Sequence, residues 1–198
     1  MKTGKKTKWL RVAVVILIIM VAALFSGLAY SNSRTYNLTL VVAPAASGGN
    51  TGNQFAFYVL INGKLSNSSD IVLPSNTLIK ITIFEHASDL SPPFIDSAQD
   101  VLGTQFNRMM LFSDVIGATS PNKVPDLSSG KYVMQVSPND LSDTFSISNG
   151  VNIPVPPSSV VIAYITFNSP GTYYWGDMCN CGPSMDVLGE MYGNLTVV

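Results

Sequence analysis

The chain has 198 residues, of which only 12% are charged, and five of its eleven basic residues lie within the first eleven positions. The remaining residues include six basic and twelve acidic ones, which give that part of the chain a formal charge of −6. Because no basic stripe stands outside the N-terminus, the composition gives no reason to expect a nucleic-acid partner. The length allows one membrane segment and one domain of ordinary size.

The first thirty residues predict a single membrane anchor. Residues 1–11 form a basic segment, and residues 12–30 carry no charge over nineteen positions, which is close to the hydrocarbon thickness of a bilayer. The positive-inside rule then places residues 1–11 in the cytoplasm and residues 35–198 outside, as one extracytoplasmic domain held at the cell membrane. The alternative is a signal peptide that is cleaved near Gly27–Ala29, and it would export the same domain.

Beyond residue 35, short β-branched or aromatic runs are separated by turns rich in Pro, Gly and Asn, and Asn62-Gly63 is a strong hairpin signal. The number and spacing of these runs predict an all-β domain, a Greek-key β-sandwich or barrel. Residues 97–112 are less regular and are interpreted as a short helix outside the sandwich. The predicted strands span residues 37–42, 55–61, 70–73, 78–84, 132–136, 144–147, 160–167, 172–175 and 195–198.

Three Asn-x-Ser/Thr sequons begin at Asn37, Asn67 and Asn194. In an exported domain they are candidate N-glycosylation sites. Such triplets also arise by chance in a chain that is rich in Asn and Ser, so the prediction rests on the export of the domain.

The last sixty residues or so carry several motifs in a fixed order. Ser137–Phe145 reads SPNDLSDTF, Pro170–Tyr173 reads PGTY, and CNCGPSM at 179–185 is followed by Met191-Tyr192-Gly193. This frame resembles the CuA domain of cytochrome oxidase subunit II and, more broadly, the cupredoxins. The resemblance implies a cupredoxin-like sandwich outside the membrane, attached to the N-terminal anchor.

The copper ligands of that family can be placed on this chain one at a time. Cys181 matches the second cysteine and Met191 matches the methionine. The first bridging cysteine is replaced by Asp177, the first histidine by Asp143 and the second histidine by Met185. Type 1 copper and CuA both need two imidazoles, and the whole chain has one histidine. The resemblance therefore implies a copper site whose ligand positions have degenerated.

The sulfur-rich loop leaves a second possibility open. Cys179, Cys181, Met185 and Met191 together could bind Cu(I), a soft ion that accepts thiolates and thioethers without nitrogen ligands. The alternatives are a strained Cys-x-Cys disulfide, or free thiols with methionines that fill the core.

No other catalytic constellation is evident in the sequence. The paired carboxylates Asp140 and Asp143, and likewise Asp186 and Glu190, are predicted to be solvated loop charges or caps.

The resemblance implies a non-catalytic subunit II of a haem–copper terminal oxidase of the respiratory chain, of the quinol-oxidising kind, because such subunits keep the cupredoxin fold without CuA. The chain itself would then bind no cofactor, and haem and copper are expected in subunit I. The expected partners are subunit I, other membrane subunits and the lipid bilayer. The alternatives are an independent membrane-anchored protein that binds Cu(I) or transfers electrons, and a cell-surface structural β-sandwich.

Overall fold

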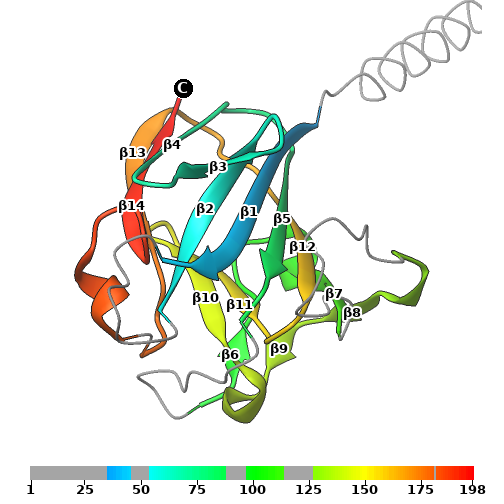
Figure 1. The fold of residues 1–198 in the computed structure, drawn as a ribbon. Coiled ribbons are helices and arrows are strands. Elements are labelled where there is room, and N and C mark those ends of the chain that lie inside the picture. Colours follow the sequence, from blue (N-terminus) through cyan, green and yellow to red (C-terminus); the bar gives the residue numbers. More distant parts are fainter. Residues whose placement is uncertain (1–34, 46–53, 88–96, 114–126, 181) are drawn as a thin grey trace, which may run out of the picture. The chain divides into compact units, whose positions relative to one another are not determined.

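The structure is a computed structural model that describes residues 35–45, 54–87, 97–113, 127–180 and 182–198 (Figure 1). The chain divides into two compact units, Met1–Arg34 and Thr35–Val198. The first unit, with the predicted anchor at 12–30, lies outside the described residues. Within the described ranges, no helix has the length and apolar character needed to span a membrane.

The second unit is built from two main β-sheets (Figure 1). β1 runs parallel to β5 and β14 runs parallel to β4, whereas the other ladders between the described strands are antiparallel. The larger sheet has the order β3 (Lys64–Asn67), β2 (Phe55–Ile61), β1 (Tyr36–Pro44), β5 (Ile79–Glu85), β12 (Val160–Ile165), β7 (Met109–Phe112) and β8 (Lys131–Val133). The smaller sheet has the order β11 (Val151–Val155), β10 (Asp143–Ile147), β13 (Gly171–Gly176), β14 (Tyr192–Val197) and β4 (Asp70–Leu73).

Short elements complete the described part. The strands β6 (Gln99–Asp100) and β9 (Gln135–Val136) pair with each other, away from the two main sheets. Four single-turn 3-10 helices lie in connections: η1 (Gln105–Asn107), η2 (Leu127–Ser129), η3 (Pro138–Asp140) and η4 (Gly182–Asp186).

The chain passes repeatedly from one sheet to the other, at the β4–β5, β11–β12 and β12–β13 connections, as Greek-key sandwiches do. The alternation of apolar and polar residues along the strands explains the sandwich, because it gives each sheet one apolar face that must be covered. β5, for example, buries every second residue. The all-β prediction is confirmed for the described residues, and the predicted N-terminal helix falls outside them.

An aromatic cluster fills the centre of the core between the sheets. The ring centres of Phe57, Phe145 and Trp175 lie 5.5 to 5.8 Å apart. The indole Nε1 of Trp175 donates a hydrogen bond of 2.9 Å to the backbone oxygen of Ser68, so its one polar atom is satisfied. Gly193 lies directly opposite Trp175 in the β13–β14 ladder.

Gly193→Ala is expected to destabilise the fold by about 1–3 kcal/mol, because the core has no space for the added methyl group. A Cβ at this position would lie 2.5 Å from Trp175 Nε1 and 2.8 Å from the backbone oxygens of Ser68 and Ser69. Urea unfolding of the purified chain measures the loss. The matched control is Gly176→Ala in the neighbouring strand, where the nearest atom is 3.6 Å away. Equal losses for the two variants would contradict this packing argument.

The predicted helix at 97–112 is wrong. This segment holds β6, η1 and β7 instead. The reason is visible in β7, where Met109 and Leu111 enter the main core while Met110 and Phe112 join a second hydrophobic cluster. A period of two with both faces covered is the pattern of an internal strand, and β7 pairs with β12 on one side and β8 on the other.

Two further differences concern single strands. The predicted strand at 132–136 divides into β8 and β9, which belong to different sheets. The strand β11 was not predicted because it contains Pro154. A proline is tolerated there because β11 lies at the edge of the smaller sheet.

Candidate functional site

Four residues with acidic side chains come together at one end of the sandwich. Glu85 is the last residue of β5, Asp143 is the first residue of β10, and Asp177 and Cys179 follow β13. All four are buried. Asp143 and Asp177 act electrostatically on both Glu85 and Cys179, so three carboxyl groups and a thiol lie within electrostatic reach of one another. We call these four residues the carboxyl cluster.

Asp177 links the loop after β13 to strand β10. Its Oδ1 atom accepts hydrogen bonds from the backbone nitrogen of Thr144 at 2.7 Å, from Thr144 Oγ1 at 2.9 Å and from the backbone nitrogen of Cys179 at 3.1 Å. Thr144 Oγ1 in turn accepts a hydrogen bond of 2.7 Å from the backbone nitrogen of Met178. A buried carboxylate that accepts three hydrogen bonds holds two segments together that are 33 residues apart in the sequence.

Glu85 and Asp143 form a buried pair of carboxyl groups. Glu85 is fully buried and Asp143 is 2% exposed. Glu85 Oε1 accepts a hydrogen bond of 2.7 Å from the backbone nitrogen of Ala87, and Asp143 Oδ2 accepts one of 3.1 Å from Ser142 Oγ. Burial, followed by the charge of Asp143 and a hydrogen bond to it, raises the pKa of Glu85 well above its ordinary value.

The second oxygen of Glu85 has no hydrogen-bond partner in the described part of the chain. Glu85 Oε2 is buried and meets no hydrogen-bond donor among the described residues. A buried carboxylate oxygen without a donor disfavours the charged form, and the charge of Asp143 acts in the same direction. Burial and the nearby Asp143 therefore favour the protonated form of Glu85 in the folded protein.

Cys179 contributes a free and fully buried thiol. Burial, followed by the charges of Asp177 and Asp143, raises the pKa of this thiol far above its usual range. A thiol binds metal ions as the thiolate, so a carboxylate environment opposes the form that a copper ion would need.

The other predicted sulfur ligands are not members of the carboxyl cluster. Met191 lies in the hydrophobic core, Met185 is partly buried and packs against that core, and Cys181 lies outside the described residues. Within the described part of the chain, no group of three or more His, Cys, Asp or Glu side chains is arranged to hold a metal ion.

The prediction that the paired carboxylates are solvated is wrong for Asp143 and Glu190, both of which are buried. Asp143 is drawn inward because β10 pairs with β11 and its side chain meets Glu85. Glu190 lies just before β14, where its backbone oxygen accepts a hydrogen bond from Phe57. The partners Asp140 and Asp186 are exposed, as expected.

Glu85 was missed by the interpretation of the sequence, although the sequence contains a signal for it. In the run IKITIFE, Glu85 stands in the same alternating row as Ile79, Ile81 and Ile83. Side chains two residues apart on a strand face the same side. A glutamate at the end of an inward row is therefore predicted to be buried, and a buried carboxyl group needs a proton or a partner.

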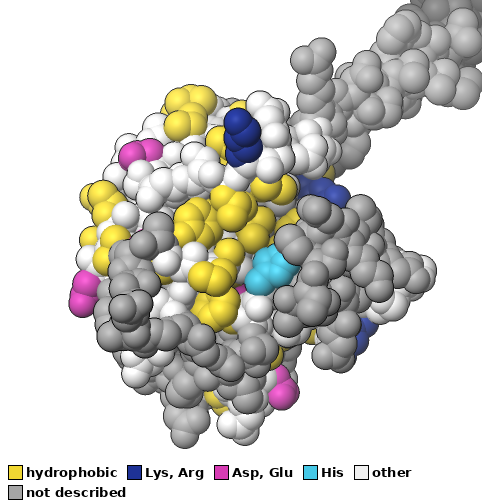
Figure 2. All heavy atoms as spheres, in the orientation of Figure 1, with side chains coloured by type: hydrophobic (Ala, Val, Ile, Leu, Met, Phe, Trp, Pro, Cys, Tyr) yellow, Lys and Arg dark blue, Asp and Glu magenta, His cyan; other side chains and the backbone are white. Residues whose placement is uncertain are grey.

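The single histidine, His86, points away from this row and is half-buried (Figure 2). Its backbone nitrogen donates a hydrogen bond of 3.2 Å to the oxygen of Val42. Burial lowers the pKa of its imidazole. On the face shown in Figure 2 the ring lies at the edge of an apolar area.

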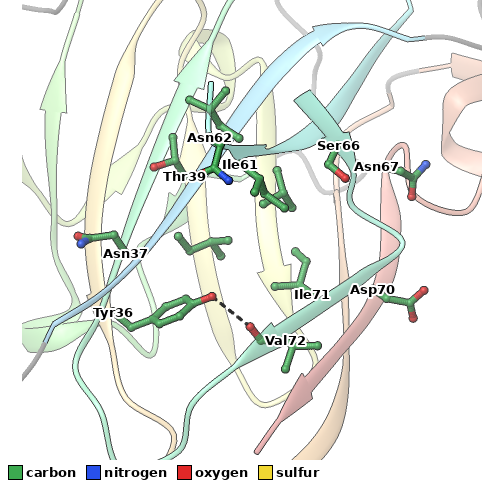
Figure 3. Close-up of a pocket in the computed structure, with 13 residues that line it drawn as sticks. Tyr36, Asn37, Thr39, Ile61, Asn62, Ser66, Asn67, Asp70, Ile71 and Val72 are labelled. Atoms are coloured by element: carbon green, nitrogen blue, oxygen red, sulfur yellow. Dashed lines mark hydrogen bonds between the residues drawn. The ribbon is translucent and has the colours of Figure 1, made fainter. Parts of the chain in front are cut away.

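An open groove of about 500 Å³ lies elsewhere, between residues of β1, β2 and β4 (Figure 3). The sequon residues Asn37 and Asn67 line it and are exposed. Tyr36 reaches across it with a hydroxyl–carbonyl contact of 3.4 Å to Val72. The third sequon residue, Asn194, donates a hydrogen bond of 3.1 Å to Asp70 from its side-chain nitrogen. Glycosylation of the three residues stays a prediction.

No protein-family model matches the sequence, and a comparison with curated proteins found no match. Among solved structures, a multicopper oxidase is 12% identical with a TM-score of 0.37, over 82% of this chain and 44% of that one. Reduced rusticyanin is 16% identical with a TM-score of 0.33, over 83% of each chain. A chain of a haem–copper terminal oxidase dimer is 12% identical with a TM-score of 0.35, over 95% of this chain and 98% of that one.

This chain spans less than half the length of the multicopper oxidase. At these identities and TM-scores, the likenesses carry no argument about what this chain binds or does.

Proposed function

We propose that the chain is a non-catalytic subunit II of a haem–copper terminal oxidase of the quinol-oxidising kind, with a cupredoxin-like sandwich that is kept without copper. The observation that carries the proposal is the set of three hydrogen bonds to Asp177 Oδ1. Asp177 and Asp143 stand at the positions that the sequence resemblance assigns to a cysteine and a histidine ligand, and both take part in buried hydrogen bonds between protein groups.

These hydrogen bonds connect two segments that a bound copper ion would otherwise connect. The resemblance implies that a copper ion in this family would join β10 to the loop after β13, because the ligand positions matched by Asp143 and by Asp177 lie in these two segments. In this chain the Asp177 carboxylate joins the same two segments, from Thr144 to Cys179. These hydrogen bonds close that end of the sandwich with protein groups, and Cu(II) would lack the imidazole ligands that it favours; both points support the proposal. A domain of this kind serves through its shape and its surface.

The remainder of the proposal concerns the location and partners of the chain. Residues 12–30 anchor it as a single membrane span, with residues 1–11 in the cytoplasm and the sandwich outside. Its partners are subunit I, which supplies haem and copper, other membrane subunits and the surrounding lipid. Purification of the chain from native membranes tests this assembly, because a haem-bearing subunit is expected to accompany it.

Anaerobic Cu(I) titration of the purified full chain tests the absence of copper. Micromolar or weaker binding is expected, unchanged in Cys179→Ser and Cys181→Ser, because the buried Cys179 thiol resists deprotonation beside Asp177. Saturable tight binding that disappears in both cysteine variants and in Met191→Leu would contradict the proposal. It would instead favour a Cu(I) site made of Cys179, Cys181, Met185 and Met191.

A further inference from the structure

An exposed aromatic and basic cluster lies at the edge of the larger sheet, where η1 leads into β7 and where β8 ends. Figure 1 shows the position of β7 and β8. We define it as the Arg108 patch: Phe106, Arg108, Tyr132 and Met134. The three uncharged side chains are 70%, 59% and 63% exposed, in that order. The guanidinium carbon of Arg108 lies 4.9 Å from the ring centre of Phe106 and 4.2 Å from that of Tyr132.

Strand register brings the fourth member of the patch beside the others. Met109 pairs with Val133 in the β7–β8 ladder, so Arg108 and Met134 are the next residues along the same two strands. The backbone oxygen of Met134 also accepts a hydrogen bond of 2.8 Å from Val101. The four side chains therefore belong to one local structure.

Several hydrogen bonds stabilise the loop that presents Phe106 and Arg108. Thr104 Oγ1 donates a hydrogen bond of 2.9 Å to the backbone oxygen of Arg108, and Asn107 Oδ1 accepts one of 3.1 Å from the backbone nitrogen of Gly103. Just before this loop, Leu102 exchanges two backbone hydrogen bonds with Asn152 of β11. A patch that is already ordered loses little conformational freedom when it binds a partner.

Phe106 is also strained. Its backbone has φ 63° and ψ 21°, in the left-handed region that bulky residues rarely adopt. The ring is mostly exposed, so burial in this fold does not compensate for the strain. What the strained backbone does achieve is to place the ring beside the Arg108 guanidinium. Strain that persists at an exposed residue is typical of binding sites.

The charge of the patch indicates the chemistry of its partner. Among the described residues, the Arg108 side chain has two cation–π contacts, with these two rings, and no ion pair is found for it there. The chain beyond its basic N-terminus is acidic overall. Arg108 itself is half-buried, and a guanidinium that stacks on aromatic rings can still direct an N–H edge toward the two oxygens of a carboxylate.

We infer that the Arg108 patch docks a partner protein, through an aspartate or glutamate of that protein surrounded by apolar side chains. Phenylalanine, tyrosine, methionine and arginine are the residues that protein interfaces favour, and buried aromatic and arginine side chains carry most of their binding energy. An anionic membrane surface instead attracts clusters of several Lys and Arg, and this patch has one. The inference holds whether or not the chain is an oxidase subunit.

Site-specific photo-crosslinking in native membranes tests the inference. The probe is a benzophenone amino acid at Met134 of the full chain, and the crosslinked peptides are identified by mass spectrometry. The expected product joins this chain to a second polypeptide, at a segment that contains an aspartate or glutamate. Arg108→Gln is expected to lower the yield roughly tenfold, as loss of an interface hot spot does. Lys64→Gln, the same charge change at an exposed residue of β3, is expected to leave the yield unchanged.

Two further variants separate docking from folding. Phe106→Gly is expected to lower the yield while the melting temperature stays equal or rises, because glycine relieves the left-handed strain. Arg108→Glu is expected to abolish the crosslink, and replacement of the identified partner carboxylate by arginine is expected to restore it. Crosslinks only to lipid or only within this chain, a yield that Arg108→Gln does not change, or failure of the charge swap would each overturn the inference.

Discussion

Asp177→Ala is expected to destabilise the sandwich by about 3 kcal/mol or more, the largest effect of any single substitution at the carboxyl cluster. The change leaves two backbone N–H groups and the Thr144 hydroxyl without their shared acceptor in a buried place. Each buried donor that loses its partner costs about 1–3 kcal/mol. Urea unfolding of the purified full chain, followed by tryptophan fluorescence, measures the loss.

Asp186→Ala is the matched control for this prediction, because Asp186 belongs to η4 in the following loop and is exposed. Its effect is expected to stay within about 0.5 kcal/mol. Asp177→Asn keeps an acceptor oxygen at the same place, so it should lose less stability than Asp177→Ala. If Asp177→Ala and Asp186→Ala were equally stable, the hydrogen bonds of Asp177 would not be what closes this end of the sandwich.

The stability of Glu85→Gln relative to the natural protein is expected to increase as the pH rises. The ordinary pKa of a glutamate is 4.5, and burial and Asp143 raise the pKa of Glu85 well above it in the folded protein. Between these two values, the folded protein holds a proton that the unfolded chain has released. The stabilising contribution of this proton is complete below about pH 4.5 and falls by about 1.4 kcal/mol per pH unit up to the folded-state pKa.

Glutamine at position 85 removes this dependence, because its amide donates to Asp143 at every pH and its oxygen can still accept from Ala87. Urea unfolding of both proteins between pH 4.5 and pH 8 gives the difference directly. Asp143→Asn should shorten the pH range over which this difference changes, because it removes the second-largest cause of the raised pKa of Glu85. If the difference in the free energy of unfolding between Glu85→Gln and the natural protein stayed constant with pH, the fold would not raise the pKa of Glu85.

Most of the sandwich follows from local sequence patterns. Alternation and turn residues place β2 at 55–61 and β4 at 70–73, and they place β1, β5, β10, β12, β13 and β14 to within two or three residues. The errors arise where long-range pairing decides the structure. β7 and β11 are strands because their neighbours complete the sheets, and neither Met109–Phe112 nor the proline-containing Val151–Val155 shows the usual pattern of a half-buried strand.

The carboxyl cluster could be predicted only in part. The sequence resemblance points to Asp143 and Asp177, and the sandwich brings both to the same end. What those carboxylates do there depends on Thr144 and Glu85, which are far from Asp177 in the sequence and meet it only through the fold. Hydrogen bonds across such distances leave no local pattern, although the inward row of β5 does reveal the burial of Glu85.

The haem content of the material that is purified from native membranes through this chain tests the central claim most directly. If the chain is a subunit II that keeps its sandwich without copper, the purified complex should show the absorption spectrum of haem. A haem-bearing membrane polypeptide should also be present in a fixed ratio to this chain. Purified chain that carries no haem and no such companion, under conditions that keep membrane complexes intact, would contradict the account.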